Sequence, residues 1–202
     1  MKILVACEYS GRVRQAFRDR GHDAWSCDLL PSEDNSPYHI VDDVLLLLDD
    51  GWDMLIAHPP CTYLCSSGLH WNKRVEGREE LTLDAMLFVL NLMGDGFIAH
   101  GIKRIALENP IGCISTAYRK PDQIIQPYQY GEDASKSTCL WLKGLPPLRP
   151  TEFIEPRIVN GKNRWANQTD SGQNNICPSD GRWKERSRTY QGIANAMAEQ
   201  WG

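Results

Sequence analysis

Short apolar runs recur along the first third of the chain. Four of them have the length of a strand: residues 2–7, 23–30, 39–44 and 52–57. Between the first two, Val13, Ala16 and Phe17 recur at helical spacing, and Gly21 is a natural helix end. Strands joined by short crossovers predict a mainly parallel sheet.

The remaining pattern extends this sheet. We expect an amphipathic helix with one apolar face, made by Leu83, Met86, Leu87, Leu90 and Met93. Three further strands are expected at residues 103–107, 124–125 and 138–142, and a closing helix at residues 190–201. We therefore expect one α/β domain over residues 1–202, with a Rossmann-like sheet and helices on both faces.

Residues 151–184 break the periodicity. Asn, Gln, Ser, Gly and Asp dominate this segment, which predicts a long loop. From Arg157 to Arg188 there are seven basic residues against three acidic ones, whereas from Asp28 to Asp53 there are eight acidic residues and no Lys or Arg. The basic segment could attract phosphate, although both segments also fit ordinary solvated surface.

A cysteine follows the fourth strand through two prolines. Proline has no N–H and a fixed φ, so Pro59-Pro60 turns the chain out of the sheet and delivers Cys61. In an open α/β sheet the loops at the carboxyl ends of the strands hold ligands. The pattern predicts a nucleophile on a stiff mount, although a buried structural cysteine has the same spacing. Cys65 is a second candidate thiol without the proline mount.

Glu108 ends the fifth strand before Pro110. A carboxyl group at that position, neutral for part of a reaction cycle, can hydrogen-bond a ring nitrogen while a thiolate adds to the ring. The alternative is a carboxylate paired with Arg104 or another base. Together, Cys61 and Glu108 suit the activation of a heterocycle.

The first strands end in residues typical of a nucleoside site. Ser10-Gly11 stands between strand and helix, where backbone N–H groups can receive an anion. Asp28 ends the second strand, where an acid commonly binds ribose hydroxyls, and Asp43 ends the third, where an acid could accept an adenine amino group. Each could instead be a helix cap or a surface carboxylate.

The seven cysteines are irregularly spaced, and we expect no disulfide framework. Cys61 and Cys65 lack a second Cys/His pair at zinc-ribbon spacing, so we expect no metal. The first apolar run is too short for a signal peptide and no run reaches membrane-spanning length. These features predict a cytoplasmic protein with no membrane contact, and they leave its oligomeric state open.

These motifs together resemble the C5-cytosine methyltransferase superfamily, and its small phage-type members in particular. Pro59-Pro60-Cys61 resembles the Pro-Cys nucleophile motif, and Glu108-Asn109-Pro110 the Glu-Asn motif. Glu8-Tyr9-Ser10-Gly11 stands where the first cofactor motif does, and the turn and helix at residues 192–198 resemble the C-terminal motif on the cofactor side. The resemblance spans nearly the whole chain.

The resemblance implies a reaction. S-adenosylmethionine, or a modified form of it, would bind at one group of residues: Glu8, Ser10, Gly11, Asp28, Asp43, Pro59 and Asn195. Cys61 would attack C6 of cytosine, Glu108 would engage N3, and C5 would take the methyl group. Lys136 and Arg188 are the candidates for further catalytic groups, and Pro60 and Asn109 for substrate contacts. In duplex DNA the target base must first be flipped out.

Three departures bear on the substrate. Thr62 replaces the family's Gln after the cysteine, and its arginine-rich strand motif has only Lys136-Ser137-Thr138 or Arg186-Ser187-Arg188 as counterparts. Residues 151–184 stand in place of a large target-recognition domain. That segment carries Trp165, and Trp183 near its end, which could stack on bases. The expected partner is therefore single-stranded or flipped-base DNA, or a free cytosine nucleotide, and a non-catalytic nucleotide- or DNA-binding protein is the competing hypothesis.

Overall fold

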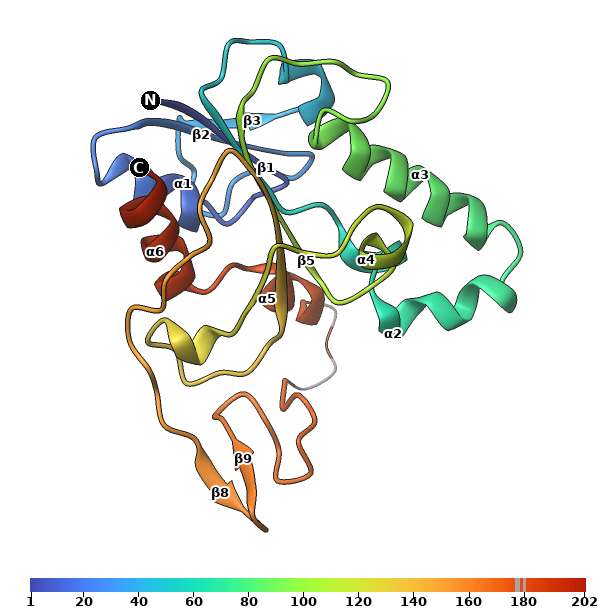
Figure 1. Cartoon of the computed structure of the whole chain (residues 1–202), viewed down its shortest axis with the longest axis vertical. Coiled ribbons are helices and arrows are strands. Elements are labelled where there is room, and N and C mark those ends of the chain that lie inside the picture. The colour runs from blue at the N-terminus through green and yellow to red at the C-terminus, as the bar shows by residue number, and fades with distance from the viewer. Residues whose placement is uncertain (177–178, 180) are drawn as a thin grey trace.

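The computed structural model describes residues 1–176, 179 and 181–202 and shows an α/β fold (Figure 1). Seven strands form one sheet in the order β3-β2-β1-β4-β5-β7-β6. Their bounds are β1 Lys2–Ala6, β2 Asp23–Asp28, β3 His39–Val41, β4 Met54–Ala57, β5 Arg104–Pro110, β6 Gln123–Ile125 and β7 Thr138–Lys143. Strands β1 to β5 pair in parallel, and β7 runs antiparallel to both β5 and β6. The predicted mainly parallel sheet is confirmed.

Helices cover both faces of the sheet. Ile3 and Val5 of β1 face one core with α1 and α6, whereas Leu4 and Ala6 face the other core with α3. Because both faces are buried, β1 is apolar at successive positions rather than at alternate ones. The α-helices are α1 Arg12–Arg18, α2 Ser66–Leu69, α3 Arg78–Leu92, α4 Ile114–Ala117, α5 Arg182–Ser187 and α6 Gln191–Trp201. Single-turn 3-10 helices are η1 Val44–Leu47, η2 Cys61–Tyr63, η3 His70–Lys73 and η4 Pro127–Gln129.

Strand β5 is longer than the sequence predicts. It continues through Glu108 and Asn109 to Pro110, and Glu108 pairs with Leu140 of β7. The proline is tolerated at the strand's last residue, where no further ladder bond is needed. Glu108 therefore lies inside the sheet edge rather than on a loop beyond it, and its backbone position is fixed from both sides.

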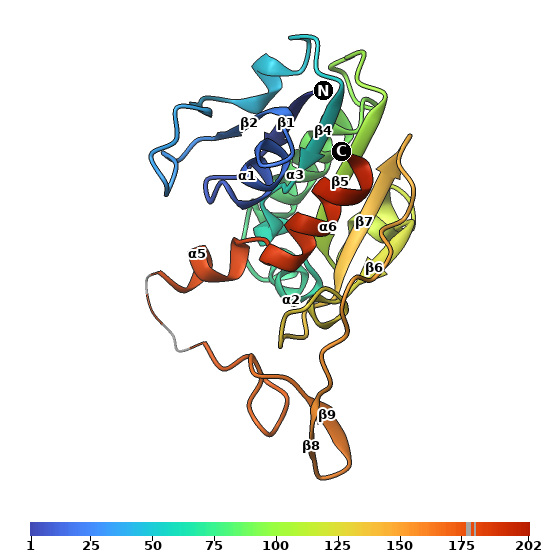
Figure 2. The ribbon, with the colours of Figure 1, turned by 90° about the vertical axis from the view of Figure 1, so that its left-hand side faces the viewer.

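The segment predicted as a long loop, residues 151–184, contains regular structure. Strands β8 (Arg157–Val159) and β9 (Lys162–Arg164) form an antiparallel hairpin. Its turn residues Asn160 and Gly161 have φ values of 50° and 73°, as an Asn-Gly hairpin turn requires. Figure 2 shows this hairpin reaching away from the sheet, joined to α6 through α5. Cys177 lies outside the described residues.

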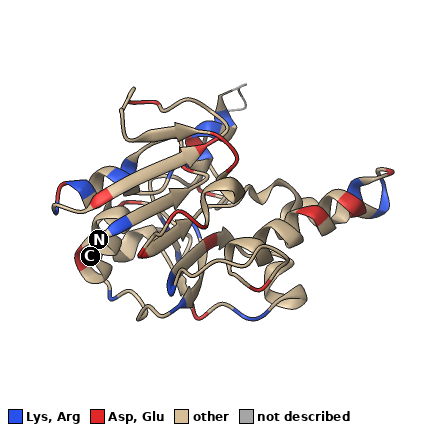
Figure 3. Cartoon of the chain, turned by 90° about the horizontal axis from the view of Figure 1, so that it is seen from above, with Lys and Arg blue, Asp and Glu red and all other residues tan. Residues whose placement is uncertain are grey.

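Two absences hold for the part of the chain that the structure describes. No helix there is long and apolar enough to cross a membrane. No group of three or more His, Cys, Asp or Glu side chains there is placed to hold a metal ion. Figure 3 shows acidic and basic residues on many of the elements, although α2, α4, β4 and β6 carry none.

Candidate active site

The turn after β4 mounts Cys61 at the carboxyl edge of the sheet. The amide of His58 still bonds the carbonyl oxygen of Ala6 at 3.0 Å, so the chain leaves the ladder only at Pro59. Pro60 is exposed and precedes η2, whose first residue is Cys61. The amide of Cys65 closes the turn on the carbonyl oxygen of Cys61 at 2.9 Å. The thiol is exposed on a turn whose backbone is fixed at both ends.

Asn109 braces this turn from the neighbouring strand. Its side-chain amide donates to the carbonyl oxygen of Pro59 at 2.7 Å, and the residue is 1% exposed. Because Asn109 is buried and its amide is used by the turn, the structure gives no support to its predicted substrate contact. Proline carbonyls beside a strand end lack a ladder partner, and Asn109 supplies one. Its role is to hold Cys61 at a fixed place relative to β5.

Glu108 pairs with a histidine that the sequence did not single out. The Nδ1 atom of His58 lies 3.0 Å from Oε2 of Glu108, and the two side chains are only 7% and 13% exposed. Burial opposes ionisation of Glu108, but the hydrogen bond from His58 and the charges of Lys136 and His58 outweigh it and hold the pKa of Glu108 below its usual range. The carboxyl group is therefore ionised in the free protein, and the expectation that it is neutral for part of a reaction cycle stays a prediction.

Lys136 is the cation that acts on both reactive groups. Desolvation by the surrounding protein raises the pKa of the Cys61 thiol, as do the nearby Cys65 and Glu108, whereas the charge of Lys136 lowers it. The Nζ atom of Lys136 donates to the carbonyl oxygen of Arg186 at 3.0 Å, which fixes the ammonium group. The predicted catalytic set therefore comes together at three positions: Cys61, Glu108 and Lys136.

Arg188 lies elsewhere. Its guanidinium makes a two-pronged pair with Glu33, with distances of 3.0 and 2.6 Å. Because a bidentate pair uses the fork of the guanidinium, Arg188 joins the segment after α5 to the loop after β2. The structure gives it no contact with Cys61 or Glu108, so its predicted catalytic role has no support among the described residues.

The turn after β1 places a side chain of the protein itself against the free amides at the start of α1. Cys7 has a positive φ of 57°, uncommon for a non-glycine residue, and this conformation turns the chain toward Glu8. The carboxylate of Glu8 accepts hydrogen bonds from the amides of Val13 and Arg14 at 2.6 and 3.1 Å. Glu8 therefore occupies two of the amides at the start of α1, whereas the expectation that the amides at Ser10 and Gly11 receive an anion stays a prediction.

The other glycine-loop residues are close to Glu8. The hydroxyl of Ser10 lies 3.5 Å from its carboxylate. Gly11 has φ of 72° and precedes α1, and a Cβ there would collide with the guanidinium of Arg14. Burial raises the pKa of Glu8 above its usual value, although the positive charge of His58 opposes this shift.

The two aspartates after β2 and β3 gather at the same edge. One carboxylate oxygen of Asp28 accepts the amide of Leu30 at 3.0 Å, and Asp43 caps η1 through the amide of Leu45 at 3.0 Å. Burial first, and the charges of both aspartates next, raise the pKa of the Cys7 thiol, which places the two acids around the end of β1. Each keeps one carboxylate oxygen with no hydrogen bond among the described residues.

Three other predicted site residues lie apart from this edge. Asn195 is exposed on α6 and accepts a hydrogen bond from Gln191 at 3.0 Å. Trp165 stacks on Tyr128 with ring centres 4.4 Å apart, so one of its faces is covered by the protein. Trp183 is 53% exposed beside Tyr9, so of the two tryptophans it is the more available for stacking.

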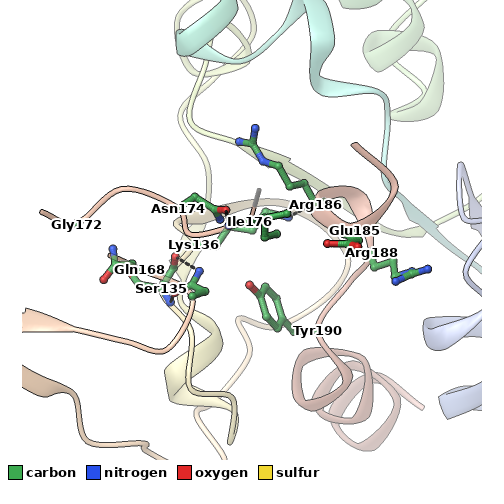
Figure 4. Close-up of a pocket in the computed structure, with 11 residues that line it drawn as sticks. Ser135, Lys136, Gln168, Gly172, Asn174, Ile176, Glu185, Arg186, Arg188 and Tyr190 are labelled. Carbon is green, nitrogen blue, oxygen red and sulfur yellow. Dashed lines mark hydrogen bonds between the residues drawn. The ribbon is translucent and has the colours of Figure 1, made fainter. Parts of the chain in front are cut away.

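A cavity of about 250 Å³ opens beside Lys136 (Figure 4). Tyr190 points into the space between Lys136 and Glu185. Basic groups outnumber acidic ones in its lining, and side-chain amides supply further polar atoms: Lys136, Arg186, Arg188, Glu185, Asn167, Gln168 and Asn174. Lys136 is common to this cavity and to the charges around Cys61 and Glu108, so the two are adjacent.

His58 is the functional residue that sequence reasoning missed. Parallel pairing of Ala57 with Leu107 sets residues 58 and 108 side by side, and this register is not contained in the local sequence pattern. Comparison of the sequence with protein-family models and with curated proteins finds no match.

Proposed function

We propose that this protein transfers a methyl group, or a modified methyl group, from S-adenosylmethionine or a derivative of it to C5 of cytosine in DNA, through a covalent bond to Cys61. The observation that carries the proposal is the exposed Cys61 thiol on a braced Pro-Pro turn, with the ionisable pair of His58 and Glu108 on the adjoining strands. A thiol and a carboxyl group at one sheet edge suit attack on a ring whose nitrogen is stabilised by the acid.

The topology supports a nucleoside cofactor. Strand order reverses at β1, which has β2 on one side and β4 on the other. Ligands of open α/β sheets bind at such a switch point, beyond the carboxyl ends of the strands. An antiparallel β7 beside β5 is also the arrangement of S-adenosylmethionine-dependent methyltransferases, and this likeness is a fold-level analogy.

The residues at the switch point fit that cofactor. Asp28 and Asp43 each keep a carboxylate oxygen that could accept hydrogen bonds from ribose hydroxyls or an amino group. When bound, the cofactor would supply an electrophilic methyl group. Because Glu8 occupies the start of α1, the methionine carboxylate would need other donors than those amides.

In the proposed reaction, Cys61, Lys136 and Glu108 each have a separate role. The Cys61 thiolate adds to C6 of cytosine, and the ammonium of Lys136 stabilises that thiolate. Glu108, once it carries a proton, donates it to N3, where negative charge would otherwise develop as the ring is attacked. After C5 has taken the methyl group, a base removes the proton from C5, and the resulting elimination breaks the bond to Sγ and releases the modified cytosine.

The cavity beside Lys136 favours a substrate with phosphate groups. Its basic lining includes Lys136, whose charge acts on Cys61, and the basic β8–β9 hairpin belongs to the same chain segment as the lining residues Asn167 and Gln168. Phosphate contacts by Lys and Arg supply most of the sequence-independent affinity for DNA. The phosphate of a free cytosine nucleotide could bind the same basic groups, so a free nucleotide is tested separately from DNA.

The test is transfer of label. The purified protein is incubated with labelled S-adenosylmethionine and single-stranded DNA, duplex DNA or dCMP, and the nucleosides are separated by mass. We expect 5-methylcytosine from at least one DNA substrate. Cys61→Ser and Glu108→Gln should abolish transfer, and the matched control Cys65→Ser should keep it.

Two results would contradict the proposal. Methyl transfer to dCMP alone would support the proposed reaction but would show that its substrate is a free nucleotide and not DNA. No transfer to any of the three, with binding of DNA or nucleotide intact, would favour a non-catalytic binding protein on this fold.

A further inference from the structure

His58 is the last residue of the chain before the Pro-Pro turn, and it is buried between two acids. Its Nδ1 atom lies 3.0 Å from the carboxylate of Glu108 on β5. The charge of Glu8, after β1, is the second one that interacts with the ring. The side chain is only 7% exposed, so solvent does not satisfy the ring.

The ionisation state of Glu108 determines whether Nδ1 of His58 carries the hydrogen of this hydrogen bond. An ionised carboxylate can only accept hydrogen bonds, so the hydrogen in this bond belongs to His58. The Nε2 atom is also buried and has no hydrogen-bond partner among the described residues. A hydrogen on that nitrogen as well would make the ring an imidazolium, which can give up its Nδ1 hydrogen and remain a neutral ring.

We propose that His58 is the proton carrier of Glu108: it holds the proton that the ionised carboxyl group lacks and delivers it through Glu108 to N3 of the target cytosine. This inference rests on the proposed function, in which N3 must be protonated as the thiolate adds. His58 does not touch the base in this scheme, so it is a positioning residue for the reaction rather than a catalytic one.

The protons balance through the cycle. As the bond between Sγ of Cys61 and C6 forms, N3 takes a proton from Glu108, and Glu108 takes the Nδ1 proton of His58. The ring is left neutral with its Nε2 hydrogen. When the C5 proton has been removed and the bond to Sγ breaks, the proton on N3 returns to Glu108 and then to Nδ1. No other donor or acceptor is needed for this proton.

Three charged groups act on or within the pair of His58 and Glu108 and bear on how activity depends on pH. They are Glu8 after β1, Glu108 on β5 and Lys136 before β7. Activity should rise with pH as the Cys61 thiolate forms, because the pKa of this thiol is raised. The proposed relay also needs the proton carried by His58, so activity should fall where that proton is lost.

The discriminating variant is His58→Asn. The amide nitrogen of asparagine can keep the hydrogen bond to Glu108, but it has no proton to give. We expect kcat to fall by about 100-fold, with KM little changed, and the falling limb of the pH profile to move to lower pH. His100→Gln is the matched control, because His100 is half-buried, bonds backbone carbonyls of α3 and lies off the site.

If the hydrogen bond between His58 and Glu108 has only a structural role, the kinetics of the variant should differ from this expectation. If His58→Asn keeps the kcat and the pH profile of the wild type, the proposal is overturned. Should this variant fail to fold, which circular dichroism would show, ¹⁵N NMR of the His58 ring in the wild-type protein still tests it. Two hydrogen-bearing ring nitrogens at neutral pH, and one in Glu108→Gln, support the proposal.

The same spectra separate the two proposals. A single hydrogen-bearing nitrogen in the wild type overturns the role of His58, even where methyl transfer is observed. An absence of methyl transfer by the wild type to any substrate overturns the proposed function and the role of His58 within it.

Discussion

At the scale of single residues, Asn109 determines how firmly the nucleophile is held. Replacing it with alanine leaves the carbonyl oxygen of Pro59 without its buried donor. Such a loss costs about 1–3 kcal/mol. Urea denaturation should therefore show a lower free energy of unfolding for Asn109→Ala, and the variant should also lose kcat because Cys61 is less well positioned.

The control for that prediction is Asn195→Ala. Asn195 is exposed on α6, so its removal should change the free energy of unfolding by less than about 0.5 kcal/mol. Equal effects of the two substitutions would contradict the bracing role of Asn109.

The influence of Lys136 on the thiol can be measured without any substrate. The ammonium lowers the pKa of Cys61, so Lys136→Met should raise it and reduce the thiolate fraction at a given pH. The rate of alkylation of Cys61 by iodoacetamide, followed by peptide mass spectrometry, should then reach its midpoint at higher pH than in the wild type. Lys136→Arg keeps the charge and should stay near the wild-type profile. An unchanged midpoint in Lys136→Met would remove this residue from the site.

At the scale of elements, α6 approaches η4 so closely that only glycine fits at the contact. A Cβ at Gly192 would overlap the carbonyl oxygen of Tyr130, and the amide of Gly192 donates to Glu132 at 3.0 Å. Gly192→Ala must therefore displace α6, which contributes Ile193 and Met197 to the core under β1.

We expect Gly192→Ala to lower the free energy of unfolding by about 3 kcal/mol, the upper end of the usual cost of overpacking. The urea midpoint measures it. Gly181→Ala is the matched control, because nothing lies within 4 Å of a Cβ at Gly181, whose φ is −86°. A loss of stability in the control as large as in Gly192→Ala would show that helix displacement is not the cause.

Elements differ in how well the sequence foretells them. Buried parallel strands such as β1 and β4 are continuous apolar runs, so both were predicted within two residues. The β8–β9 hairpin was missed because its strands have three residues each and little apolar alternation. Its only local signal was the Asn160-Gly161 pair, which is the strongest short-range mark of a hairpin turn.

The candidate site likewise has features that the local sequence predicts and features that it does not. Cys61 and Glu108 were predictable because prolines mark the ends of their strands. The pair of His58 and Glu108 depends on register between strands distant in sequence, and the capping of α1 by Glu8 depends on the turn at Cys7. The stacking of Trp165 on Tyr128 likewise joins two separate segments. Contacts of this kind come from tertiary packing, which a local pattern does not contain.

At the scale of the whole molecule, basic groups meet at the end that carries the hairpin. Lys162 is on β9, whereas Arg186 on α5 lines the cavity beside Lys136. Arg104, in contrast, begins β5 and lies near Met1, at the opposite edge of the sheet from Glu108. If DNA enters over the cavity, only the first two charges should contribute to binding.

Salt dependence tests this arrangement. Each phosphate contact releases a counterion, so the slope of log affinity against log salt falls by about one when a contacting Lys or Arg is removed. Fluorescence anisotropy with a cytosine-containing single strand should show this reduction, and weaker binding, for Lys162→Ala and Arg186→Ala. Arg104→Ala removes the same charge and should leave both slope and affinity near the wild type. If all three variants weaken binding equally, net charge alone accounts for it, and DNA does not enter over the cavity.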